Sequence, residues 1–415
     1  MIDIKFLLKN PEKVRTSLKN RGVDLDVDKL ISLEEERKEL LQEVENLRKE
    51  QNNISPKVKD NPELLSKAKE LKVSLKEKEE VLDKTEQEFK KNLSLLPNIP
   101  LDNVPVGKDE TESKVVREWG KVPKFNFQIK DHADLGKEWD LIDIERAAKV
   151  SGARFTYLKN ELALIEFALI QLAFNTLLKE GFVPVIPPIL IRDEMMKSMG
   201  YVDTEADFAE RYYLEKDKLF LVGTAEQSIG PMHQGEILED LPKRYVAFST
   251  CLREESGSYG KDTKGIFRLH QFDKLEMFSF TKPEDSEKEH LFLLSLEEKM
   301  MQALKLPYRV VHLCTGDMSR PSASTYDIET WFPSQNRYRE THSVSNCTDF
   351  QSRRLNIRFK SEEGKTEFVH MLNGTAFAMV RMLIAIIENY QRKDGRIDVP
   401  KVLQKYLGFK IIPKK

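Results

Sequence analysis

The chain of 415 residues has only three cysteines, Cys251, Cys314 and Cys347, which lie far apart and form no CxxC pair. This scarcity argues against a disulfide framework and a structural zinc site, and it favours a reducing compartment. The start, MIDIKFLLKN, has no long apolar stretch behind a basic segment, so no signal peptide is expected. The longest apolar runs, 186–191 and 382–387, are far shorter than a membrane span. These absences predict a soluble cytoplasmic protein without a membrane partner.

A global excess of basic charge is also absent. Lys+Arg 67 against Asp+Glu 69 gives a formal net charge of −2, so any surface for nucleic acid must be a local patch. Hydrophobic residues make up 40% of the chain, which is enough for a sizeable core. The length predicts two or three domains.

Glycine is missing between Gly22 and Gly107, and the first hundred residues carry 21 basic and 21 acidic side chains. Mostly apolar positions recur there at steps of three and four, which predicts two long heptad helices joined at Pro56–Pro62 as an antiparallel hairpin. The first seam comprises Leu30, Leu33, Arg37, Leu40, Val44, Leu47, Gln51 and Ile54. The second comprises Leu64, Ala68, Leu71, Leu75, Lys78, Leu82, Thr85, Phe89, Asn92 and Leu96.

Heptad helices most often serve dimerisation, and the alternative is a lever that contacts a large partner. Lysines gather at and beyond the predicted tip, which suits a phosphate backbone, although lysines also commonly just solvate a helix. They are Lys57, Lys59, Lys67, Lys69, Lys72 and Lys76. The predicted division is a helical arm at 1–100, a Pro- and Gly-bearing linker at 101–118 and a catalytic domain at 119–415.

The segment 245–280 carries most of the predicted chemistry. Tyr245–Arg253 and Ile266–Phe280 alternate like strands, and the loop between them contains Gly257, Gly260, Gly265, Lys261 and Lys264. Alternation places cations, an aromatic ring and a carboxylate on one face of the hairpin, a set that suits a nucleotide and a substrate ammonium. A solvated sheet face explains the same pattern equally well. The face comprises Arg253, Glu255, Arg268, His270, Phe272, Lys274 and Glu276.

Two further features point to interfaces or sites. Pro184, Pro187 and Pro188 in FVPVIPPILI predict an edge strand and a subunit contact, because proline is excluded from central strands. Arg381 interrupts the apolar run AMVRMLIAII, where an unpaired charge is costly, so it is either a structural ion pair or a functional cation.

Taken together, these motifs resemble seryl-tRNA synthetases, of the class II aminoacyl-tRNA synthetases, over almost the whole chain. The start MIDIKFLLKNPEKVR and EVENLRKEQNNIS are similar to that family's helical arm, and GFVPVIPP is similar to class II motif 1, which forms the dimer interface. Arg253-Glu254-Glu255 followed by GIFRLHQFDKLE resembles motif 2. RYRETHSVSNCTDFQSRR and LNGTAFAMVRMLIAIIENYQ resemble the late strand and motif 3, and Thr224-Ala225-Glu226 resembles the family's TAE loop.

The resemblance implies an α+β fold, in which an antiparallel coiled-coil arm precedes an antiparallel sheet flanked by helices. It also implies a serine–tRNA ligase that uses ATP and Mg²⁺, forms seryl-adenylate and pyrophosphate, and transfers serine to tRNA(Ser) as a homodimer. Whether tRNA(Sec) is charged as well stays open.

The implied catalytic cations are Arg253 and Arg381, and Glu340 and Ser343 are the implied Mg²⁺ ligands. The implied ATP-binding set is Arg253, Glu254, Glu255, Arg268, Leu269, Phe272, Glu340, Thr341, His342, Ser343 and Arg381. The implied serine-binding set is Thr224, Ala225, Glu226, Arg253, Glu276, Asn373 and Thr375. Strict strand alternation separates Glu340 from Ser343, so a bulge or a bend is expected between them.

The chain departs from the family pattern at Glu254, His342, Val380 and Thr375, but it keeps each arginine and carboxylate that the chemistry needs. Two alternatives remain. An amino acid:carrier-protein ligase shares the catalytic core but lacks a long arm. A non-catalytic RNA-binding protein derived from a synthetase predicts decay at Arg253, Glu276, Glu340 or Arg381.

Overall fold

The computed structural model describes residues 1–59, 61, 63–256 and 264–413, and its chain forms two compact units, Met1–Pro97 and Asn98–Lys415. The first unit is helical, and the second is built on an eight-stranded sheet. This arrangement is the α+β fold that the sequence predicts. The loop residues Gly257, Gly260 and Lys261, and with them the predicted basic loop, fall outside the described ranges.

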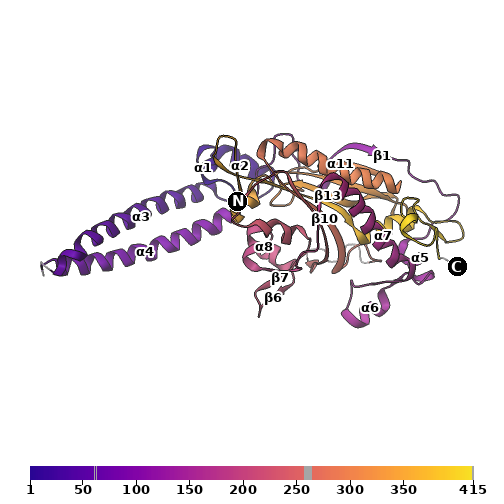
Figure 1. Ribbon diagram of the computed structural model, residues 1–415, viewed down its shortest axis with the longest axis horizontal. Coiled ribbons are helices and arrows are strands. Elements are labelled where there is room, and N and C mark those ends of the chain that lie inside the picture. Colours follow the sequence, from indigo (N-terminus) through magenta and orange to yellow (C-terminus); the bar gives the residue numbers. More distant parts are fainter. Residues whose placement is uncertain (60, 62, 257–263, 414–415) are drawn as a thin grey trace. The chain divides into compact units, whose positions relative to one another are not determined.

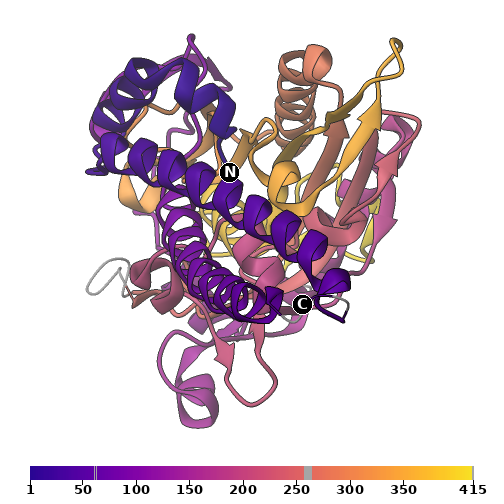
Figure 2. The same ribbon diagram turned by 90° about the vertical axis from the view of Figure 1, so that its left-hand side faces the viewer.

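The arm consists of α3 (Val27–Ile54) and α4 (Leu64–Ser94), which run side by side in opposite directions (Figures 1 and 2). Leu40 and Val44 of α3 pack with Leu75 and Leu82 of α4, as the heptads predict. The short helices α1 (Ile4–Lys9) and α2 (Pro11–Asn20) precede the arm, and η1 (Ser55–Lys59) begins its turn.

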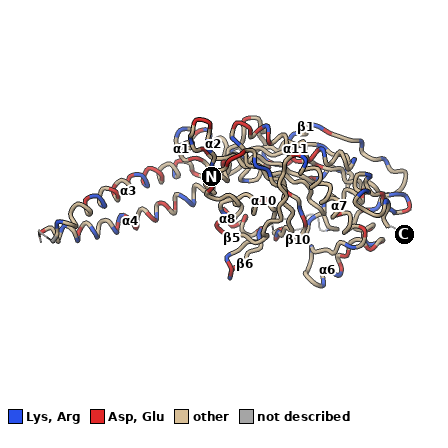
Figure 3. Tube along the Cα trace, in the orientation of Figure 1, with Lys and Arg blue, Asp and Glu red and all other residues tan. Residues whose placement is uncertain are grey.

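Charges of both signs follow one another along the two arm helices (Figure 3). Several of them pair between the helices, as Arg48 does with Glu79 (2.6 Å), Lys78 with Glu43 (2.6 Å) and Lys67 with Glu50 (2.8 Å). These exposed pairs each contribute little free energy, so the apolar seam holds the hairpin and the ion pairs fix its register.

The sheet of the second unit has the strand order β1-β11-β12-β13-β16-β10-β9-β4. All neighbouring strands are antiparallel except β4, which runs parallel to β9 at one edge. The proline-rich segment therefore does form an edge strand, as predicted. The bounds are β1 (Lys114–Trp119), β4 (Val183–Val185), β9 (Lys243–Leu252), β10 (Gln271–Thr281), β11 (Tyr308–His312), β12 (Ser324–Phe332), β13 (Arg337–Asn346) and β16 (His370–Ala378).

Helices α7 (Asn160–Leu177), α11 (Ser286–Leu304) and α13 (Met379–Asn389) pack on the sheet and bury most of the core (Figure 1). Shorter helices are α5 (His132–Glu138), α6 (Ile144–Ser151), α8 (Asp193–Met199), α9 (Glu205–Ala209), α10 (Glu226–Ile229) and α12 (Phe350–Leu355). The other strands form four small sheets. Two of these have three strands each: one contains β5 (Leu190–Arg192), β6 (Tyr213–Leu214) and β7 (Leu219–Leu221), and the other contains β8 (Ile237–Leu238), β14 (Arg358–Lys360) and β15 (Thr366–Phe368). The remaining two are the pair β2 (Ile142–Asp143) and β3 (Tyr157–Leu158) and the pair β17 (Ile397–Asp398) and β18 (Ile411–Ile412).

Among the described residues, Asn160–Glu180 is the one helical segment that is long and apolar enough to cross a membrane by length and composition. Leu162, Ile165, Leu169 and Leu172 of this segment lie in the core of the second unit. Such burial is typical of the core helix of a globular domain.

Two boundaries differ from the sequence-based expectation. Residues 101–118 belong to the second unit: the Leu101 N–H donates to Ala323 O (2.9 Å), and β1 pairs with β11. In addition, β10 begins at Gln271 and not at Ile266. Residues 266–270 form turns and bends, and their backbone bonds elsewhere, as when the His270 N–H donates to Arg154 O (3.0 Å).

Candidate active site

A cavity of about 470 Å³ opens on one face of the sheet, where residues of β10, β13 and β16 line it. Gly374 and its neighbours show the two faces: a Cβ on Gly374 would lie 3.1 Å from Glu297 Oε1 of α11, whereas Asn373 and Thr375 line the cavity. The helix α11 therefore covers the opposite face of the sheet. The residues predicted from the sequence that line the cavity are Thr224, Glu226, Arg253, Glu255, Arg268, Leu269, Phe272, Glu276, Glu340, Thr341, Ser343, Asn373, Thr375 and Arg381.

Three predicted site residues lie outside this lining. Ala225 is fully buried at the start of α10. His342 is also fully buried, and its ring packs edge-to-face on Phe377 (5.8 Å), so its side chain points away from the cavity. Burial lowers the pKa of His342 to about 3. Glu254 follows β9 and donates its N–H to Glu210 O (3.1 Å).

At the deep end of the cavity, a buried carboxyl collects hydrogen bonds. Glu226 receives the Tyr201 hydroxyl on Oε2 (2.8 Å), and the amides of Gln351 (3.2 Å) and Asn373 (3.0 Å) on Oε1. Burial and the neighbouring Glu276 raise the pKa of Glu226 to about 7. A carboxyl in this setting binds a cation in its charged form.

A second carboxylate, Glu276 on β10, lies beside it and is 1% exposed. Thr224 Oγ1 donates to Glu276 Oε2 (3.0 Å), and Lys274 forms an ion pair with Glu276 and a hydrogen bond with Thr224 (3.3 Å). The register brings Thr375 of β16 opposite Glu276. Two carboxylates, two hydroxyls and an amide thus surround a space suited to an ammonium and a hydroxyl group.

Two arginines also line the cavity. Arg253 donates from Nε to Gly223 O (3.1 Å), and its guanidinium lies over the Phe272 ring (5.3 Å). Arg381 pairs with Glu340 through both the backbone O (3.0 Å) and Oε1 (2.9 Å), and lies over Phe267 (4.9 Å). The charge inside the apolar run is therefore paired and faces the cavity.

The bulge expected between Glu340 and Ser343 is present. On β12, Asp327, Ile328 and Glu329 pair with Ser343, His342 and Glu340, so Thr341 is the additional residue. This extra residue turns Glu340 and Ser343 to the same face, where both line the cavity.

The oxygens near this bulge fit a hard cation. Desolvation at the cavity wall acts to raise the pKa of Glu340, whose side chain is still 49% exposed, but the charges of Arg381 and Arg253 outweigh it and lower the pKa. Asp327, opposite Ser343, has a buried Oδ1 without a protein hydrogen-bond partner. No group of three or more His, Cys, Asp or Glu side chains in the described ranges is arranged to hold a metal ion. Magnesium suits such a sparse donor set, because it commonly binds one or two carboxylates together with substrate phosphates.

Sequence reasoning missed several lining residues. Lys274 lies on the predicted polar face without an assigned role, although its position two residues before Glu276, on the same face of β10, is a usable signal. Tyr201 and Arg211, which contact each other (5.6 Å from guanidinium to ring centroid), come from loops with no periodic pattern.

The fold matches that of class II aminoacyl-tRNA synthetases. The class II core domain of the synthetases for Gly, His, Pro, Ser and Thr matches residues 211–390, and the seryl-tRNA synthetase N-terminal domain matches residues 1–100. The serine–tRNA ligase of Dictyoglomus turgidum is 45% identical over 100% of both chains.

Solved structures agree with this class. Seryl-tRNA synthetase from Pyrococcus horikoshii complexed with ATP has a TM-score of 0.91 and 40% identity, over 99% of each chain. The cytoplasmic serine–tRNA ligase of Naegleria fowleri in complex with AMP has a TM-score of 0.85 and 34% identity, over 98% of this chain and 96% of that one. The chain belongs to the seryl-tRNA synthetase family.

Proposed function

We propose that this chain is an active serine–tRNA ligase that forms seryl-adenylate from serine and ATP and then transfers the seryl group to tRNA(Ser). The observation that carries the proposal is the convergence of Arg253, Glu276, Glu340 and Arg381 on one cavity. A non-catalytic derivative predicts loss of these groups, and a carrier-protein ligase predicts no arm. The full-length likeness to serine–tRNA ligases supports the same choice.

In the first step, the serine carboxylate attacks the α-phosphate of ATP and pyrophosphate leaves. Negative charge grows on the phosphate oxygens, and a preorganised cation lowers the barrier without a nucleophilic side chain. Arg253, whose Nε donates to Gly223 O, is assigned to bridge the carboxylate and the α-phosphate. Arg381, which pairs with Glu340, is assigned to the γ-phosphate, and Phe272 is assigned to adenine.

Serine selection is assigned to the deep end of the cavity. Glu226 and Glu276 hold the ammonium, while Thr224, Asn373 and Thr375 add hydrogen bonds near the hydroxyl. A site built to hydrogen-bond the serine hydroxyl discriminates against alanine, which lacks this group, by a factor of about 10⁴ or more. Exclusion of threonine requires a tight wall at the β-carbon.

Magnesium is assigned to Glu340 and Ser343, in company with phosphate oxygens of ATP. When bound, it neutralises phosphate charge and fixes the orientation of the phosphates. Isothermal titration of Mg²⁺–ATP into wild-type protein and Ser343→Ala tests this assignment. Tighter binding with Mg²⁺ than without it is expected for the wild type, with a smaller difference in the variant.

A homodimer is proposed from apolar exposure at the edge strand β4 and on α7. The side chains of Phe167, Val183 and Ile186 are 67%, 51% and 84% exposed in the single chain. Exposed apolar side chains of this kind are typical of a surface that a partner covers. Light scattering at micromolar concentration should give twice the chain mass, and Ile186→Asp should shift it toward the monomer. A wild type that is monomeric yet active contradicts the proposal.

The arm is assigned to tRNA outside the anticodon, and the cytoplasm is the proposed site of action. Aminoacylation of tRNA(Ser) and tRNA(Sec), assayed side by side, decides whether the second is also a substrate.

The main test of the function is pyrophosphate exchange with each of the twenty amino acids. Exchange with serine alone is expected, and exchange with a different amino acid or with none overturns the proposal.

A further inference from the structure

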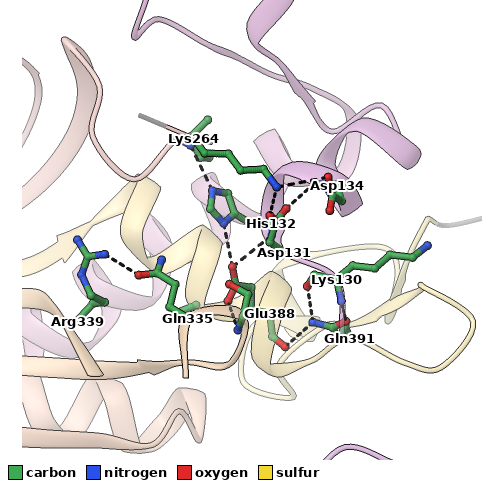
Figure 4. A network of polar contacts seen from close by, with 12 residues as sticks. Lys130, Asp131, His132, Asp134, Lys264, Gln335, Arg339, Glu388 and Gln391 are labelled. Carbon is green, nitrogen blue, oxygen red and sulfur yellow. Dashed lines mark hydrogen bonds and ion pairs between the residues drawn. The ribbon is translucent and has the colours of Figure 1, made fainter. Parts of the chain in front are cut away.

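A buried polar network behind the nucleotide end of the cavity joins four segments that are distant in the sequence (Figure 4). Its centre is the pair of His132, the first residue of α5, and Glu388 near the end of α13, which are 5% and 0% exposed. His132 Nδ1 lies 2.9 Å from Glu388 Oε1, which also accepts the His132 N–H (3.2 Å). Glu388 Oε2 accepts the Ser334 N–H (3.1 Å).

These contacts determine which ring nitrogen of His132 carries the proton. Nδ1 faces a carboxylate that accepts hydrogen bonds, so Nδ1 is the donor. Nε2 is then the acceptor, and the Ile266 N–H lies 3.3 Å from it. His132 therefore uses one nitrogen to hold Glu388 and the other to hold the backbone of Ile266.

The residue before Ile266 shows how closely the ring approaches. Gly265 has φ +78°, and a Cβ built on it would lie 2.1 Å from His132 Nε2. Only glycine satisfies both the left-handed backbone and this contact. The imidazole thus lies directly against the turn that leads into Phe267 and Arg268.

That turn forms part of the cavity wall. Ile266, Phe267 and Arg268 all line the cavity, whereas His132 and Glu388 do not. Phe267 lies under the guanidinium groups of Arg339 (3.8 Å) and Arg381 (4.9 Å).

The same carboxylate also connects to Arg339. The Glu388-bound Ser334 belongs to η7 (Pro333–Gln335), and Gln335 of this turn accepts from Arg339 Nη1 (2.6 Å). The buried Glu388 carboxylate therefore connects, through these contacts, both to the turn that carries Phe267 and to the segment that carries Arg339, whose guanidinium lies over the Phe267 ring.

We propose that His132, oriented by Glu388, is a positioning residue for ATP: by accepting the Ile266 N–H it fixes the wall that carries Phe267 and Arg268. The inference rests on the proposed function, since it takes ATP as the occupant of this end of the cavity. The proposal predicts that changes at the pair affect the binding of ATP and not that of serine. Serine binds at the deep end of the cavity, where neither His132 nor Glu388 has a contact.

Two amide variants separate the two roles of the ring. In His132→Asn the amide nitrogen stands near the place of Nδ1, so the donor to Glu388 remains and the acceptor for Ile266 is removed. In His132→Gln the amide oxygen reaches toward the place of Nε2, so the acceptor for Ile266 is restored. Lys130→Ala is the matched control, because Lys130 forms an exposed ion pair with Glu138 in the same network.

Steady-state pyrophosphate exchange should give a KM for ATP about tenfold higher in His132→Asn, as expected for loss of one buried hydrogen bond. The KM for serine and kcat should change less than about twofold, and His132→Gln and Lys130→Ala should resemble the wild type. Gly265→Ala, which presses a methyl group against Nε2, should raise the KM for ATP selectively and serves if His132→Asn does not fold.

The inference is overturned if these variants shift the KM values for ATP and serine alike, or leave both unchanged. It is also overturned if His132→Gln is as impaired as His132→Asn, since the pair then only stabilises the fold. Absence of serine-dependent exchange in the wild type is a separate result, which contradicts the proposed function itself.

Discussion

The arm and the catalytic unit use charge in opposite ways. Along the arm, acidic and basic side chains pair at the surface, as Arg48–Glu79 and Lys78–Glu43 do, with solvent on at least one side. In the cavity, Glu226 and Glu276 lie side by side with little exposure, and burial together with this repulsion raises the pKa of Glu226 to about 7.

The surface ion pairs of the arm therefore concern its stability, whereas the buried carboxylates of the cavity concern substrate binding. Exposed pairs contribute roughly 0–1 kcal/mol each, so the arm tolerates their loss singly. The two buried carboxylates repel each other, Lys274 compensates for only part of their charge, and the remainder favours the binding of a substrate ammonium. If the comparison is correct, changes in the cavity abolish both the formation of seryl-adenylate and the transfer of serine to tRNA, whereas changes in the arm affect only the transfer.

The largest effect is expected from the cavity arginines. Arg253→Ala or Arg381→Ala should lower the rate of serine-dependent pyrophosphate exchange by about 10²–10³, since a preorganised cation is worth roughly 3–4 kcal/mol in the transition state. Aminoacylation should fall in parallel. Arg392→Ala, which removes an arginine paired with Asp398 outside the cavity, is the control. Near-normal exchange in Arg253→Ala with unchanged circular dichroism contradicts the assigned role.

A shortened arm should divide the two reactions. Replacing residues 41–81 with a short Gly-Ser turn keeps Leu40 opposite Leu82 and the Arg37–Glu86 pair (3.5 Å), so the base of the hairpin remains. Aminoacylation should fall by about 10² or more, because the shortened arm no longer reaches the tRNA phosphates. Pyrophosphate exchange should stay within about twofold. Equal aminoacylation by the short and full-length proteins makes the arm purely structural.

The two regions also differ in how far the sequence predicts them. The heptad steps predict α3 and α4 to within a few residues of their ends, because a coiled coil is specified by local periodicity. The proline run likewise predicts that β4 is an edge strand.

The cavity depends on features without a local pattern. The bulge at Thr341 was expected from the two roles assigned to Glu340 and Ser343, but its position requires the pairing with β12. His342 was assigned to ATP by its place in the motif, and the same bulge turns it into the core. Tyr201 and Arg211 reach the cavity from loops, where neither period two nor period 3.6 applies. These residues meet through tertiary contacts, which a single sequence does not display.

The raised pKa of Glu226 predicts a pH dependence. Only the carboxylate form attracts the ammonium, so kcat/KM for serine should decrease about tenfold per unit as the pH falls below about 7 and level off above it. The KM for ATP should not follow this profile. Glu226→Gln should be weak at every pH and lose the slope, while Glu363→Gln, at an exposed carboxylate paired with Lys365, should keep it. A flat profile in the wild type between about pH 5.5 and about 8 contradicts this assignment.

The smallest effect is expected at the lysines beyond the arm turn. Lys57, Lys69 and Lys72 are exposed, and replacing all three with alanine removes three positive charges without touching the seam. If they bind tRNA phosphates, the affinity for tRNA(Ser) should fall several-fold, and the slope of log affinity against log salt should decrease by about one for each lysine–phosphate pair removed. The matched variant removes Lys84, Lys90 and Lys91, which are exposed on α4 near its C-terminal end. It should change affinity less, because A-form RNA that rests on the tip leaves the base of the hairpin uncovered. Equal reductions in affinity in the two triple variants show general electrostatic attraction along the arm and not recognition at its tip.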